Sequence, residues 1–68
     1  MVEVFKTNVQ QPEKAVELVR YILACVPVKR VNFDLHDCDN ILRVEGDGFS
    51  AAQIIDAVTA NGYRAERL

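Results

Sequence analysis

VNFDLHDCDNILRVEG, residues Val31–Gly46, decides the fold because this stretch alone describes two strands joined by a turn. Apolar residues at positions 31, 33 and 35 alternate with polar residues at positions 32, 34 and 36, as in a strand with one buried and one solvated face. Asp37–Asn40 has the composition of a turn, and a returning strand follows, with Leu42 and Val44 facing the core. The stretch therefore predicts an antiparallel β-hairpin.

A helix is predicted before the hairpin. Pro12 suits the first position of a helix, where its missing N–H would have no partner, and Pro27 stops the helix from continuing. Between the two prolines, apolar side chains recur at spacings of three and four residues: Ala15, Leu18, Val19, Ile22 and Leu23. We expect these residues to form the buried stripe of the helix, and Cys25 near its end to be a small buried hydrophobe.

Val2–Phe5 has the alternation and the β-branched residues of a further strand, ahead of this helix. We expect Val2 and Val4 to face the helices. Phe5 would then lie on the outer face of the sheet together with Ile41, and the two side chains would form a small apolar spot. Such a spot favours a homodimer or another protein as the partner of this face.

Helix and strand signals also follow the hairpin. Ser50 and Gln53 have the spacing of a capping box, which predicts the start of a second helix. Asn61 and Gly62 suit a left-handed cap at its end, and Tyr63–Leu68 suits a last short strand. The inward-facing residues of this helix are expected to be Ile54, Ile55 and Val58.

These elements follow one another in the order βαββαβ within a single domain, residues 1–68. The predicted fold class is therefore α+β, a ferredoxin-like βαββαβ sandwich with a four-stranded antiparallel sheet and two helices on one face. A domain of this length buries only about 60% of its unfolded surface, which leaves little room for an interior active site.

Composition and charge disfavour several classes of function. The formal net charge is −2 and the eight Lys and Arg residues are scattered, so we expect no basic face for nucleic acid. The longest apolar stretch, YILACVPV, is far too short to span a bilayer, and MVEVFKTNV does not have the pattern of a signal peptide. Two cysteines are fewer than small secreted domains usually carry. We therefore expect a cytoplasmic protein that does not bind membranes.

Two longer stretches carry a resemblance to a known family. YILACVPVKRVNFDL combines a helix end, a sharp break and a valine-rich strand, and AVTANGYRAERL combines a helix, a Gly-Tyr turn and a final strand. At this length and in this order, the chain resembles the heavy-metal-associated (HMA) domain, the small fold of copper chaperones and of soluble domains of metal-transporting ATPases. The resemblance spans nearly all of the chain.

The family's metal motif, Met-x-Cys-x-x-Cys, lies between the first strand and the first helix. Counted back without gaps from the matching helix, the resemblance places Val9 at the methionine, Gln11 at the first cysteine and Lys14 at the second. Val9 can still fill the core as the methionine does. Soft metal ions such as Cu(I) require thiolates, however, and a protonated ammonium has no lone pair to donate. Metal binding by the family's route is therefore not expected.

Cys38 and His36 remain as candidates for metal ligands. In the predicted fold, the turn that holds Cys38 shares one end of the molecule with Gln11, Lys14 and Tyr63. A displaced metal site there is one interpretation, with Cys38 and His36 as ligands. The simpler interpretation, which we favour, is an Asx-rich turn with one exposed thiol.

Three classes of function follow. The first, which we favour, is a small non-enzymatic binding or interaction module with a degenerate HMA fold, whose functional end comprises Val9, Gln11, Lys14, Cys38 and Tyr63. The second is a metal-binding protein or metallochaperone that uses Cys38 and His36, with further ligands from a second chain. The third is a small-ligand regulatory domain of the ferredoxin-like type, which typically dimerises. No catalytic residue set is recognisable, so neither an enzymatic activity nor a cofactor is expected.

Overall fold

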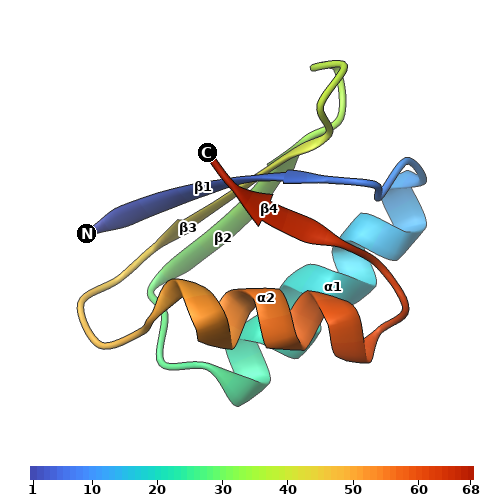
Figure 1. Cartoon of the computed structure of the whole chain (residues 1–68). Coiled ribbons are helices and arrows are strands. Elements are labelled where there is room, and N and C mark those ends of the chain that lie inside the picture. Colours follow the sequence, from blue (N-terminus) through green and yellow to red (C-terminus); the bar gives the residue numbers. More distant parts are fainter.

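Two helices cover one face of a four-stranded antiparallel sheet and leave the other face open (Figure 1). The structure, a computed structural model, describes all 68 residues. The elements are β1 (Val2–Thr7), α1 (Pro12–Cys25), β2 (Arg30–Asp34), β3 (Ile41–Glu45), α2 (Ala51–Ala60) and β4 (Ala65–Arg67). The predicted α+β class and element order are confirmed. Neither helix has the length and apolar character needed to cross a membrane.

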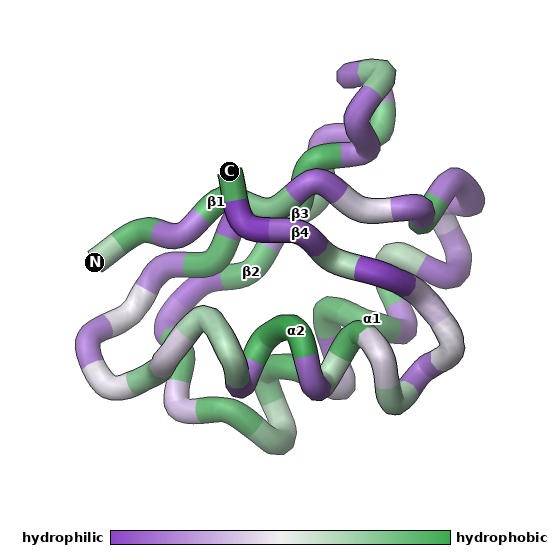
Figure 2. Tube along the Cα trace, viewed as in Figure 1, coloured by the Kyte–Doolittle hydropathy of each residue, from purple (hydrophilic) through white to green (hydrophobic).

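The strands are arranged in the order β2-β3-β1-β4, and all neighbouring pairs are antiparallel. β2 and β4 are therefore the edges of the sheet, with five and three residues respectively. Leu42 and Val44 of β3 are completely buried, as predicted, and they lie opposite Phe33 and Val31 of β2. Figure 2 shows hydrophobic residues alternating with hydrophilic ones along the strands, as expected for a sheet with one covered face.

β1 faces the helices with the opposite set of side chains from the predicted one. Phe5 is completely buried, opposite Leu42, whereas Val4 lies opposite Arg43 on the outer face and Val2 is 42% exposed. The prediction was wrong: Glu3 and Phe5 share the covered face, and Val2 and Val4 share the outer one. The Glu3 carboxylate has a partner on the covered face, since Arg67 of β4 pairs with it at 2.8 Å. The expected outer spot of Phe5 and Ile41 therefore does not exist.

The β2–β3 hairpin has the predicted turn but a shorter first strand. β2 ends at Asp34, where the side-chain carboxylate accepts a hydrogen bond from the His36 N–H at 3.1 Å. Such a hydrogen bond from the main chain to an Asp side chain takes the place of a main-chain hydrogen bond between the strands, and it turns the chain. Asn40 closes the turn with φ of 48°, in the left-handed region that asparagine tolerates, and its N–H donates to the Asp37 carbonyl at 3.0 Å.

α1 begins at Pro12, as predicted, but its buried stripe is narrower than expected. Ala15, Leu18 and Ile22 are buried, whereas Leu23 is 47% exposed and Cys25 is exposed as a free thiol. Successive side chains of a helix are about 100° apart around its axis. The three buried side chains therefore point at the sheet, and Leu23 and Cys25 lie on the two flanks of the helix. The prediction that Leu23 and Cys25 are buried was therefore wrong.

α2 has both predicted caps. The Ser50 side chain accepts from the Gln53 N–H, and the Gln53 side chain accepts from the Ser50 N–H at 2.8 Å. At the other end, Gly62 has φ of 86°, and the Tyr63 N–H donates back to the Val58 carbonyl at 3.2 Å. Ile54 and Val58 are completely buried and Ile55 packs against the core from a half-buried position.

Candidate functional site

Three loops lie at the same end of the sheet, in the right half of Figure 1, where the turn of the β2–β3 hairpin projects upward. They are residues 8–11 between β1 and α1, residues 35–40 between β2 and β3, and residues 61–64 between α2 and β4. We call this set of residues the loop end. It includes most of the positions that the sequence singles out.

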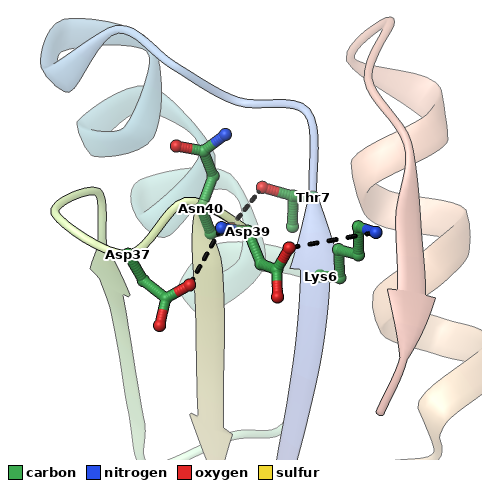
Figure 3. Close-up of polar contacts among 5 residues, drawn as sticks. All are labelled: Lys6, Thr7, Asp37, Asp39 and Asn40. Carbon is green, nitrogen blue, oxygen red and sulfur yellow. Dashed lines mark hydrogen bonds and ion pairs between the residues drawn. The ribbon is translucent and has the colours of Figure 1, made fainter.

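Thr7, the last residue of β1, fastens the hairpin to the first loop. Its N–H donates to the Asp39 carbonyl at 3.1 Å, and its hydroxyl donates to the Asn40 carbonyl at 2.6 Å (Figure 3). The same hydroxyl accepts from the Val9 N–H at 3.2 Å. The sequence analysis did not identify Thr7. Thr7 could have been recognised by its position two residues after Phe5 and two before Val9, because all three side chains are buried.

Asn8 fastens the first loop to the turn before β4. Its N–H donates to the Arg64 carbonyl at 3.3 Å, and its side-chain oxygen accepts from the Arg64 N–H at 2.7 Å. These bonds join residues 56 positions apart in the chain, so no local pattern could reveal them. Together with the bonds of Thr7, they hold all three loops in fixed relation.

Val9 is the centre of a small apolar cluster beneath the loops. It is completely buried, as predicted, and it forms this cluster with Ala15 and Leu18 of α1. Leu35 from the hairpin and Tyr63 from the last turn pack against the same cluster. The loop end is therefore supported by its own piece of core.

Gln11 and Lys14 are exposed at the start of α1. Gln11 is the N-cap residue, yet its side chain makes no capping hydrogen bond. The Lys14 ammonium lies 3.4 Å from the Glu17 carboxylate, an exposed pair of the kind that adds little stability. Lys14 and Tyr63 line a shallow cavity of about 210 Å³ with Asn61. The structure thus brings two of the predicted site residues together, with Gln11 outside the cavity.

Cys38 lies at the tip of the hairpin, exposed, between two acidic residues. Ligand atoms of Asp37, Cys38 and Asp39 all lie within 4.8 Å of one another. His36 is not part of this group. It lines a different cavity, of about 480 Å³, with Gln10 and other residues.

The two carboxylates beside Cys38 already have partners. The Asp37 carboxylate accepts from the Asp39 N–H at 2.9 Å, and the Asp39 carboxylate lies 3.8 Å from the Lys6 ammonium (Figure 3). These interactions belong to the turn and to its junction with β1. A metal ion bound at this position would have to compete with the Lys6 ammonium for Asp39.

The groups with shifted pKa values lie away from the loop end, in the segments before β2 and after β3. The Lys29 ammonium lies 3.0 Å from the Asp47 carboxylate. This hydrogen bond, and then the opposite charges, lower the pKa of Asp47 and raise that of Lys29. Both groups are fully exposed, so the pair is a surface contact.

Comparison with known proteins gives no further assignment. The chain matches no protein-family model, no curated protein and no solved structure. The resemblance to the HMA domain therefore stays a prediction, and the function of the loop end is inferred from its own residues.

Proposed function

We propose that the protein is a small non-enzymatic interaction module of the cytoplasm, whose binding surface is the loop end. The fold would be a ferredoxin-like βαββαβ sandwich, which the strand order β2-β3-β1-β4 and the placement of both helices on one face support. In this proposal the module is an HMA-type domain with a degenerate metal loop. Its contact residues are Gln11, Cys38 and Tyr63 of the loop end together with Lys14 in the first turn of α1, and they are supported by Val9.

The proposal rests mainly on the combination of fixed loops and exposed polar side chains. Thr7 and Asn8 hold the loops through hydrogen bonds, and Val9 holds them through burial. Gln11 is nevertheless free of the capping role that its position would allow. A surface that is already ordered loses little conformational entropy on binding, which favours recognition of a partner.

The residues at the start of α1 also favour a protein partner over a metal ion. Gln11 and Lys14 offer an amide and an ammonium, which suit hydrogen bonds and ion pairs with another protein. Neither is a ligand for a soft metal ion, and Lys14 adds a positive charge at this point.

A capture experiment tests the interaction surface. Tagged protein is incubated with an extract of its own cells, cross-linked, and the captured proteins are quantified by mass spectrometry. The Gln11→Ala/Lys14→Glu variant changes only exposed side chains and should reduce capture of the true partner at least about tenfold. Lys29→Glu makes the same charge reversal away from the loop end and should leave capture unchanged. Equal capture by all three proteins would contradict the proposal.

Metal binding is the second candidate, favoured by the cluster at Asp37, Cys38 and Asp39. Reduced protein is titrated with Cu(I) and Zn(II) against a competing chelator, and the titration is repeated with Cys38→Ser. The interaction module is expected to bind neither ion more tightly than the chelator. Tight binding that disappears with Cys38→Ser would replace our proposal with a metal-binding function.

A further inference from the structure

The free edge of β2 exposes a defined set of main-chain groups. The Gly46 N–H donates to the Met1 carbonyl at 3.0 Å, in register with the β1–β3 pairs. Hydrogen-bonding direction alternates along a strand, so the even-numbered residues of β3 bond to β1 and the odd-numbered ones bond to β2. Through the register of β2 with β3, residues 30, 32 and 34 face β3. The N–H and carbonyl groups of Val31 and Phe33 therefore point away from the sheet.

The sequence of β2 is complementary to itself in the antiparallel direction. β2 reads RVNFD, with Asn32 at its centre. When two copies are paired about Asn32, Arg30 of each lies opposite Asp34 of the other, and Val31 lies opposite Phe33. The outer face then has two pairs of opposite charge, and the inner face has two aromatic–aliphatic pairs, both of which stabilise neighbouring strands.

The hydrogen-bonding phase of the edge agrees with this register. Val31 and Phe33 are the residues whose main-chain groups point outward, so each Val31–Phe33 pair can exchange both of its hydrogen bonds. The Arg30–Asp34 pairs then occupy the alternate sites, where opposite side chains are closest. A shift of one residue would lose both the hydrogen bonds and the charge pairing.

An apolar stripe on α1 lies on the flank away from α2. It comprises Pro12, Val16, Val19 and Leu23, at helical spacings of four, three and four residues. Val16 is 50% exposed and Leu23 is 47% exposed, which is unusual for two large side chains on one helix face. We call these four residues the α1 stripe.

The α1 stripe is on the same side of the molecule as the free edge of β2. The opposite flank of α1 faces α2, because Tyr21 and Cys25 line a cavity with residues of α2. At the start of the stripe, Pro12 lines a cavity with Phe33 of β2. A copy paired along β2 would therefore bring its own α1 stripe towards this one.

We propose that the protein forms a homodimer in which the two β2 strands pair in antiparallel register about Asn32. The two sheets join into one continuous sheet with paired strands about 4.8 Å apart. The α1 helices then run side by side, at about the 8–10 Å typical of packed helices, and their stripes bury each other. The main-chain pairing sets the register, and the stripes supply the apolar area that strand pairing alone lacks. Its residues differ from the contact residues proposed for the loop end, although Gln10 and His36 of the loop end line the same cavity as Pro12 and Phe33.

The register of the two β2 strands is tested with charge-reversal variants, whose association is measured by sedimentation equilibrium. Arg30→Asp places two acidic residues opposite each other at both sites, and Asp34→Arg places two basic residues there. Each variant should raise the dimer dissociation constant at least about tenfold. A mixture of the two variants should regain tight association as a heterodimer, because every opposed pair is then Asp with Arg. Glu66→Arg, which reverses an exposed charge on β4 at the opposite edge of the sheet, is the matched control and should associate as the wild type does.

A substitution in the α1 stripe tests the same interface independently of the charge pairs. Leu23→Lys changes a side chain that is already half exposed, so the fold should tolerate it while the dimer weakens at least about tenfold. Val2→Lys, at a similarly exposed residue on the outer face, should have no effect on association. A wild-type protein that stays monomeric up to about 1 mM would overturn the dimer. A dimer that resists both the charge reversals and Leu23→Lys, or charge variants that do not recombine on mixing, would overturn this interface.

Discussion

Replacing both Gln11 and Lys14 by cysteine should give the protein a Cu(I) site at least about a thousandfold tighter than any site in the wild type. The two positions lie three apart at the start of α1, and both side chains are exposed. Their thiolates could converge over the helix N-terminus, where the dipole favours the ionised thiol. Binding is measured by competition with a chromophoric Cu(I) chelator.

Two further variants test whether the gain in Cu(I) affinity comes from the two new thiolates. Gln11→Ser/Lys14→Ser removes the same side chains without adding thiolates, and it should bind no more Cu(I) than the wild type. Adding Cys38→Ser to the double cysteine variant removes the exposed thiol of the hairpin and should leave the new site intact. If the double cysteine variant folds and gains no Cu(I) affinity, the loop is not a degenerate HMA metal loop.

Truncation of Phe5 should be among the most damaging single changes in the chain. Phe5 is completely buried, so Phe5→Ala removes a large side chain from the centre of the core and should cost about 3–5 kcal/mol of unfolding free energy. A domain of this size has a total stability of about 3–10 kcal/mol. Much of the Phe5→Ala protein should therefore be unfolded at room temperature, as measured by urea denaturation followed by circular dichroism.

Val4→Ala is the matched control for the orientation of β1. Val4 neighbours Phe5 but lies on the outer face opposite Arg43, so its truncation should cost about 1 kcal/mol or less. The orientation first expected from the sequence would give the reverse order, with Val4→Ala the more damaging change. The pair of variants therefore distinguishes the two phases of the strand without any further structural information.

Local signals in the sequence were sufficient for the elements whose determinants are local. The hairpin follows from its alternation and its Asx-rich turn, and α2 follows from Ser50, Gln53 and Gly62. The orientation of β1 could not be predicted in this way. Phe5 is buried on the face that also holds Glu3, and the partner of the Glu3 carboxylate is Arg67, which lies 64 positions away in the chain.

The same distinction applies to the candidate site. Burial of Val9 was expected from the resemblance, which places Val9 at the methionine of the family's metal motif. The hydrogen bonds of Thr7 and Asn8 could not be predicted, because the partner of each lies in a loop that is distant in the sequence. Leu23 was assigned to the core because the helix pattern gives a stripe but not its width, and the sheet here covers only part of it.

In the proposed dimer, the unequal lengths of the two sheet edges determine where assembly stops. β2 is a five-residue edge with outward main-chain groups, whereas β4 has only three residues, and Glu66 and Arg67 among them are exposed and charged. Short and charged edges resist the addition of further strands. Once two copies are joined through β2, the joined sheet ends in β4 on both sides. The proposed assembly therefore stops at the dimer. The two-fold pairing uses the β2 edge of both molecules, so no β2 edge remains to which a third copy could add to form a fibre.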